Sequence, residues 1–171
     1  LIQIMNILSN LKPCLNSFWK KIRIAKTPKI QITDLDEDSE VMTIDNVGIT
    51  NFGMGAVILK TNDGKKYPIT AFSPEVAKHI SDFQEDKRCD IPSIYHIVEH
   101  VCEESGLFLV KVRIYESGDA LRANLYFTGK KELILRNHRA SDAIALATFY
   151  SVPVLLKKSL LQQIPQIISK Q

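Results

Sequence analysis

The stretch from Asn137 to Lys158 constrains the fold more than any other part of the chain. A strand pattern at 131–136 leads into a polar turn, and small and apolar residues then recur at helical spacing. The residues that give this helix one apolar face are Ala143, Leu146, Ala147 and Tyr150. Pro153 ends the helix, and an extended run follows at 154–156. Because the helix is rich in alanine, we expect it to lie very close to a sheet.

The entrance of this helix gathers polar side chains. Asp142 is expected in the first turn, where a carboxylate complements the exposed backbone N–H groups and the positive end of the helix dipole. His138, Arg139 and Ser141 lie beside it in the sequence. Since helix N-termini bind anions readily, this segment is a candidate anion site.

The order of the elements repeats along the chain. Strand patterns at 42–49, 56–60 and 66–70 precede a helix at 74–83, and strand patterns at 108–115, 121–127 and 131–136 precede the helix after Asn137. Another helix is expected from Pro92 to Glu104, ending at Gly106. The sequence therefore predicts an α+β domain of two β-β-β-α units, a pattern that suggests duplication, with mixed or antiparallel sheets packed against helices.

Charge divides the chain into regions. The formal net charge is +3, yet residues 1–30 hold six basic residues and no acid, and residues 31–45 hold six acids and no base. We expect a basic amphipathic arm with an acidic linker at 1–40, the domain at 41–160 and a C-terminal tail at 161–171. The arm is expected to dock on its own domain or on a partner, with a membrane surface as the alternative.

The chain contains no apolar run long enough to predict a transmembrane helix. Its three cysteines, Cys14, Cys89 and Cys102, form no C-x-x-C pair. An odd number of scattered cysteines favours a reducing, cytoplasmic setting over a disulfide scaffold.

Two adjacent strand patterns in the second unit alternate apolar residues with basic, polar and aromatic ones. If these strands pair, one sheet face carries Lys111, Arg113, Tyr115, Arg122, Asn124 and Tyr126. Such a face could follow a phosphate backbone and stack bases. A solvent-facing antiparallel sheet would show the same alternation, so the pattern leaves both interpretations open.

His96, Glu99 and His100 match the pattern H-x-x-E-H, in which two histidines one helical turn apart bind zinc and the glutamate activates water. Three fixed positions make a weakly specific motif, and histidines partly exposed on a helix are the favoured explanation. A zinc peptidase is therefore an alternative that needs a third ligand elsewhere in the chain.

The segment Arg139-Ala-Ser-Asp-Ala-Ile-Ala-Leu-Ala147, followed by Val152-Pro-Val-Leu155, resembles the signature R-P-S-D-A-I-A-L-A…P-I of the bifunctional nuclease family. The likeness covers about residues 40–160. It implies an α+β domain with nuclease activity toward RNA and DNA, and Arg139, Ser141 and Asp142 carry over from the signature. The chain departs from the family pattern at Asn137, where the family has Asp, at Ala140, where it has Pro, and at 94–96, where Ile-Tyr-His replaces Thr-His-Asp.

The first hypothesis is therefore a nuclease with its catalytic residues at the helix entrance and RNA or single-stranded DNA as partner. Asp142, together with Glu75, is expected to hold a divalent metal ion such as Mg²⁺ or Mn²⁺, or to orient water. Arg139 would neutralise the phosphate, His138 or His96 would move protons, and Ser141 completes the set. Two alternatives remain: an ion pair that only locks the turn, and a domain that binds nucleic acid without cleaving it. A homo-oligomer is also compatible with the sequence.

Overall fold

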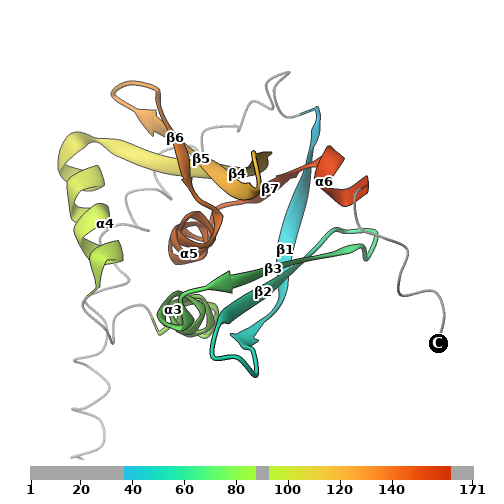
Figure 1. The fold of residues 1–171 in the computed structure, drawn as a ribbon. Helices are drawn as coiled ribbons and strands as arrows, with labels where there is room; N and C mark the ends of the chain where they lie inside the picture. Colours follow the sequence, from blue (N-terminus) through green and yellow to red (C-terminus); the bar gives the residue numbers. More distant parts are fainter. Residues whose placement is uncertain (1–36, 88–92, 163–171) are drawn as a thin grey trace, which may run out of the picture. The chain divides into compact units, whose positions relative to one another are not determined.

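Two runs of strands and helices follow one another in the chain (Figure 1). The computed structural model describes residues 37–87 and 93–162, which leaves most of the predicted arm and tail outside the described residues. The first run is β1 (Ser39–Ile49), β2 (Gly55–Lys60), β3 (Lys66–Phe72) and α3 (Pro74–Gln84). After α4 (Ile94–Ser105), the second run is β4 (Leu107–Ser117), β5 (Ala120–Gly129), β6 (Leu133–Arg139) and α5 (Ala140–Tyr150). Strand β7 (Val154–Lys157) and α6 (Lys158–Gln162) follow.

The strands form one seven-stranded sheet in the order β3-β2-β1-β7-β4-β5-β6. The two runs share this sheet because β1 pairs with β7 along Ser39–Met42 and with β2 from Thr43 onward. Strands β4 and β7 are parallel and all other neighbours are antiparallel, which makes the sheet mixed. The predicted α+β class is therefore confirmed.

Strand β7 lies in the middle of the sheet, as its sequence allows. Val154, Leu155 and Leu156 are all buried, and a short continuous apolar run is typical of a strand covered on both faces. Strand β3 lies at one edge and contains Pro68, whose missing N–H is tolerated at an edge.

Helices α3, α4 and α5 end close to the predicted positions, whereas α4 is observed from Ile94 instead of Pro92 and α6 has no predicted counterpart. Ser73 and Pro74 start α3, and Gly106 ends α4 in the left-handed conformation with φ of 62°. Ser151 ends α5 with φ of 54°, two residues before Pro153. None of the described helices is both long and apolar enough to cross a membrane.

Helices α3 and α5 pack beside each other, with α3 against β1 and β2 and α5 against β4 and β5 (Figure 1). The sequence predicts one apolar face on α5, but the helix is buried on more of its circumference than that. Nine of its 11 residues are buried because the sheet, α3 and α4 together enclose the helix. Its small side chains make this close approach sterically feasible.

The polar turn predicted after residue 136 is absent, because β6 continues through Arg139 directly into α5. Asn137 has φ of 65° at a shift in the β5–β6 register, and its backbone N–H donates to Asn124 Oδ1 at 3.3 Å. A bulge of this kind absorbs an extra residue without ending the strand. His138 and Arg139 are consequently strand residues with fixed directions.

Candidate functional site at the start of α5

Arg139 and Asp142 lie together at the start of α5. Arg139 occupies the N-cap position in an extended conformation, and Asp142 lies in the first helical turn as predicted. Arg139 Nε is 3.8 Å from Asp142 Oδ2, and the two side chains are 57% and 48% exposed. An exposed ion pair of this kind contributes only about 0–1 kcal/mol to folding. Both charged groups therefore remain accessible to a ligand.

Glu75 lies in the first turn of α3, the helix that packs beside α5. Its carboxylate faces His79 one turn later, with His79 Nε2 3.7 Å from Glu75 Oε1. His79 Nδ1 is buried and has no hydrogen-bond partner within the described part of the chain. His79 thus adds a titratable group that the sequence interpretation missed, although its spacing of four residues from Glu75 was a usable signal.

Tyr95, on α4, brings the two helix starts into one electrostatic environment. Its ring packs edge-on against His79, with centroids 5.3 Å apart, and against Phe83 at 5.0 Å. Burial, together with the smaller effect of the negative charges of Asp142 and Glu75, raises the pKa of the Tyr95 hydroxyl to about 12. The two carboxylates proposed as metal ligands therefore both act on one hydroxyl. No local sequence pattern indicated this role for Tyr95.

Ser141 and His138, the other two predicted site residues, do not lie with Arg139 and Asp142 at the exposed helix start. Ser141 is 4% exposed, so its side chain belongs to the interior of α5 and not to the solvent-exposed entrance. His138 pairs with Ala123, whereas Arg139 pairs with Arg122. Because successive strand residues point to opposite faces, the side chains of His138 and Arg139 lie on opposite faces of the sheet.

The described residues contain no group of three or more His, Cys, Asp or Glu side chains that could hold a metal ion. Ligands for a dedicated zinc site are thus missing from this part of the chain, which includes the H-x-x-E-H segment. His96 instead accepts a hydrogen bond from Ser93 N at 3.4 Å and packs against Phe149. A magnesium ion needs fewer protein ligands, since one or two carboxylates with substrate phosphates and waters suffice. Asp142 and Glu75 carry the two carboxylates that a site of this second kind would require.

The predicted polar face on β4 and β5 is confirmed by the strand register. Three cross-strand pairs build it: Lys111 with Tyr126, Arg113 with Asn124, and Tyr115 with Arg122. Opposed residues of antiparallel strands project from the same face, and the intervening Val112, Ile114 and Ala123 are buried on the other.

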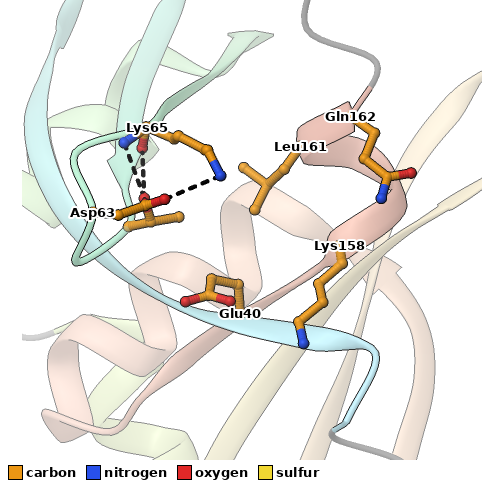
Figure 2. Close-up of a pocket in the computed structure, with 7 residues that line it drawn as sticks. Glu40, Asp63, Lys65, Lys158, Leu161 and Gln162 are labelled. Carbon is orange, nitrogen blue, oxygen red and sulfur yellow. Dashed lines mark hydrogen bonds and ion pairs between the residues drawn. The ribbon is translucent and has the colours of Figure 1, made fainter.

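A separate pocket of about 300 Å³ lies between the β2–β3 turn, β1 and α6. Figure 2 shows Lys65 beside Asp63, with an Nζ–Oδ2 distance of 3.0 Å, and Lys158 on the other side. Its lining is Glu40, Thr61, Asp63, Lys65, Lys158, Leu161 and Gln162. None of the residues predicted for catalysis lines this pocket, so it is a different feature from the helix-entrance site.

A family model described as the bifunctional nuclease domain matches residues 57–169, about two thirds of the chain. The chain belongs to this family. The match runs from β2 past α6, so it includes Glu75, Tyr95, Arg139 and Asp142. Membership confirms the resemblance seen at 139–147 and supports a nuclease-like function related to nucleic acid in general. A comparison with curated proteins found no match.

Proposed function

We propose that this bifunctional nuclease domain hydrolyses phosphodiester bonds in RNA and single-stranded DNA at the start of α5. The observation that carries the proposal is the exposed Arg139–Asp142 pair at the start of α5, 3.8 Å apart, in a chain of the bifunctional nuclease family. A carboxylate and a phosphate-binding cation thus lie together on the surface of a nuclease-family domain.

Phosphate binding is the role of Arg139 and of the backbone at the start of α5. The first N–H groups of a helix have no intrahelical acceptor, and the helix dipole favours negative charge there. Arg139 lies at the N-cap with its guanidinium more than half exposed, and its contact with Asp142 is long. A phosphate oxygen can therefore approach both the guanidinium and the backbone N–H groups, which would stabilise charge that develops during hydrolysis.

Proton transfer is the role of the carboxylates and Tyr95. Asp142 is half exposed and can accept a proton from a water molecule that attacks phosphorus. Because the pKa of Tyr95 is raised to about 12, its hydroxyl stays protonated at neutral pH and can donate a hydrogen bond to a phosphate oxygen. Glu75, whose carboxylate lies 3.7 Å from His79 Nε2, can likewise accept a proton from water, and the leaving oxygen takes its proton from solvent.

A divalent ion such as Mg²⁺ or Mn²⁺ remains part of the proposal as a charge-neutralising group. Asp142 and Glu75 are the residues that would hold it, with the remaining positions filled by substrate phosphate and water. When bound, it would supply Lewis-acid stabilisation of the phosphate.

The test is a cleavage assay on short labelled single strands of RNA and DNA, run with chelator, with Mg²⁺ and with Mn²⁺. We expect the purified protein to cleave both polymers, and an Asp142→Ala protein of unchanged circular dichroism to lose at least about a hundredfold in rate. Equal cleavage by the two proteins would remove Asp142 from the mechanism, and equal rates with and without chelator would remove the metal.

The polar face of β4 and β5 favours a second candidate function, binding of nucleic acid without cleavage. It predicts affinity for single strands that falls steeply with salt and no turnover under any metal condition. Detection of turnover that depends on Asp142 would decide against this candidate.

A further inference from the structure

Most basic groups on the polar face of β4 and β5 are already engaged. The Lys111 ammonium lies 5.0 Å from the centroid of the Tyr126 ring, a cation–π contact within the face itself. Arg113 donates to both carboxylate oxygens of Asp38, at 2.7 and 2.8 Å, and to Ser39 Oγ at 2.9 Å. Both bonds to Asp38 come from Nη2, and with the Nε bond to Ser39 they fix the guanidinium and neutralise its charge. These two side chains therefore offer little to a ligand.

The cross-strand pair Tyr115–Arg122, which adjoins Arg139 on β6, is not neutralised in this way. Tyr115 is directly opposite Arg122, and Arg122 is in turn directly opposite Arg139 on β6. The three residues form a row across β4, β5 and β6, hereafter the 115–122–139 row. It ends at Arg139, which begins α5 and contacts Asp142. The row thus joins the sheet face to the proposed catalytic site.

The charges in this row lack local compensation. Like charges opposed on neighbouring strands destabilise a sheet, and here two arginines face each other. Arg122 forms no ion pair with any residue of the described ranges. Arg139 forms only a long ion pair, with 3.8 Å between its Nε and Asp142 Oδ2. An anion placed between the two guanidinium groups would relieve the repulsion. A phosphate group has the charge and the acceptor oxygens for this position.

We propose that the 115–122–139 row binds single-stranded nucleic acid and leads its backbone to the start of α5, an inference that rests on the proposed nuclease function. Arg122 and Arg139 hold a phosphate group, and the Tyr115 ring stacks on an adjoining base. Stacking requires an unpaired base, because the bases of a duplex present their faces only to each other. The row accordingly selects single strands over duplexes.

The experiment measures binding of a fluorescent single-stranded oligonucleotide by anisotropy, in an Asp142→Asn background that prevents cleavage. Removing one phosphate contact in Arg122→Ala should weaken binding about tenfold and lower the slope of log affinity against log salt by about 0.7. Tyr115→Ala should also weaken binding about tenfold, whereas Tyr115→Phe keeps the stacking ring and should bind as the parent does.

Lys65→Ala is the matched control, because it removes one exposed positive charge in the β2–β3 turn, at the opposite edge of the sheet. It should leave both the affinity and the salt slope unchanged. Circular dichroism of every variant checks that the fold is retained. Wild-type affinity in both Arg122→Ala and Tyr115→Ala would overturn the row as a binding site, and equal loss of duplex binding in these variants would overturn its preference for single strands.

The two proposals fail in different ways. If the wild-type protein cleaves nucleic acid but neither substitution changes affinity, the row is wrong and the nuclease proposal stands. If affinity depends on both residues but the wild-type protein never cleaves, the row stands as a binding site and the nuclease proposal fails.

Discussion

Tyr95 occupies the middle of the segment in which the family pattern has Thr-His-Asp. A phenol there changes the chemistry available to the site, because it stays neutral over a wide pH range. Burial among His79 and Phe83, together with the charges of Asp142 and Glu75, holds its pKa near 12. A neutral hydrogen-bond donor thus stands where the family pattern has histidine.

The raised pKa of Tyr95 predicts how stability changes in alkali. An unfolded tyrosine ionises near pH 10, so the folded state favours the protonated form between about pH 10 and 12. The contribution is fully present below about pH 10 and is lost as pH rises toward 12. Chemical denaturation should therefore show a loss of about 1 kcal/mol between pH 9 and 11 in the wild type that Tyr95→Phe lacks. Parallel pH profiles for the two proteins would contradict the assignment.

Sequence patterns located part of this site. Asp142 was placed in the first turn of a helix from the helical spacing that follows it, and this prediction is confirmed. His79 and Tyr95 were not found, because their importance comes from the packing of α3 against α4 and α5. Such tertiary contacts leave no periodic signal in one sequence.

At the scale of elements, the connections into β4 and out of β5 depend on two glycines. Gly106 ends α4 with φ of 62°, and Gly129 ends β5 with φ of 142°. A Cβ on Gly129 would lie 2.0 Å from the carbonyl oxygen of Gly106. The two backbones can approach this closely only because Gly129 has no side chain.

Gly129→Ala should consequently destabilise the protein by at least about 2 kcal/mol, since both the backbone conformation and the clash oppose it. Gly48→Ala serves as the control, because nothing lies within 4 Å of a Cβ at that position of β1 and its φ is not positive. Gly48→Ala should change the unfolding free energy by less than about 0.5 kcal/mol. Similar denaturation midpoints for the two variants would show that the close approach is absent in solution.

Element types and most boundaries followed from local signals such as Ser73-Pro74, Gly106 and Pro153. The end of β6 at Arg139 did not follow from such a signal. A cluster of polar residues at 137–139 is typical of a turn, but Asn137 tolerates positive φ and forms a bulge that lets the strand continue. Polarity alone could not separate a turn from an exposed edge strand.

For the whole molecule, three helices meet at Phe149. Its ring contacts Phe83 of α3 at 5.1 Å between centroids, and Tyr95 and His96 of α4 at 5.9 and 5.2 Å. Phe149 is 3% exposed. The packing of this one ring therefore holds the C-terminal ends of α3 and α5 against the start of α4.

Phe149→Ala should lower the free energy of unfolding by about 3–5 kcal/mol, which is typical of a buried phenylalanine. Phe52→Ala makes the same chemical change in the β1–β2 loop, where the side chain is 91% exposed, and should cost less than about 0.5 kcal/mol. Denaturant titration followed by circular dichroism measures both values. Equal effects would mean that the helices do not meet at Phe149.

The order of strands was the least predictable feature at this scale. Hairpin pairings followed from short connections, but β7 lies between β1 and β4, and its pairing with β1 joins residues more than 100 positions apart along the chain. The apolar residues at 154–156 predicted an extended run without identifying its burial or its neighbours. Only the tertiary structure shows that β7 closes both units into one sheet.

The central claim, that the start of α5 is a phosphodiesterase site, is tested most directly by comparing two isosteric substitutions. Asp142→Asn removes the charge at the site, and Asp63→Asn removes one from the β2–β3 turn, where the side chain is 59% exposed. With a single-stranded RNA substrate, we predict that Asp142→Asn lowers the cleavage rate at least about a hundredfold while Asp63→Asn retains the wild-type rate. Wild-type cleavage by Asp142→Asn would contradict the account.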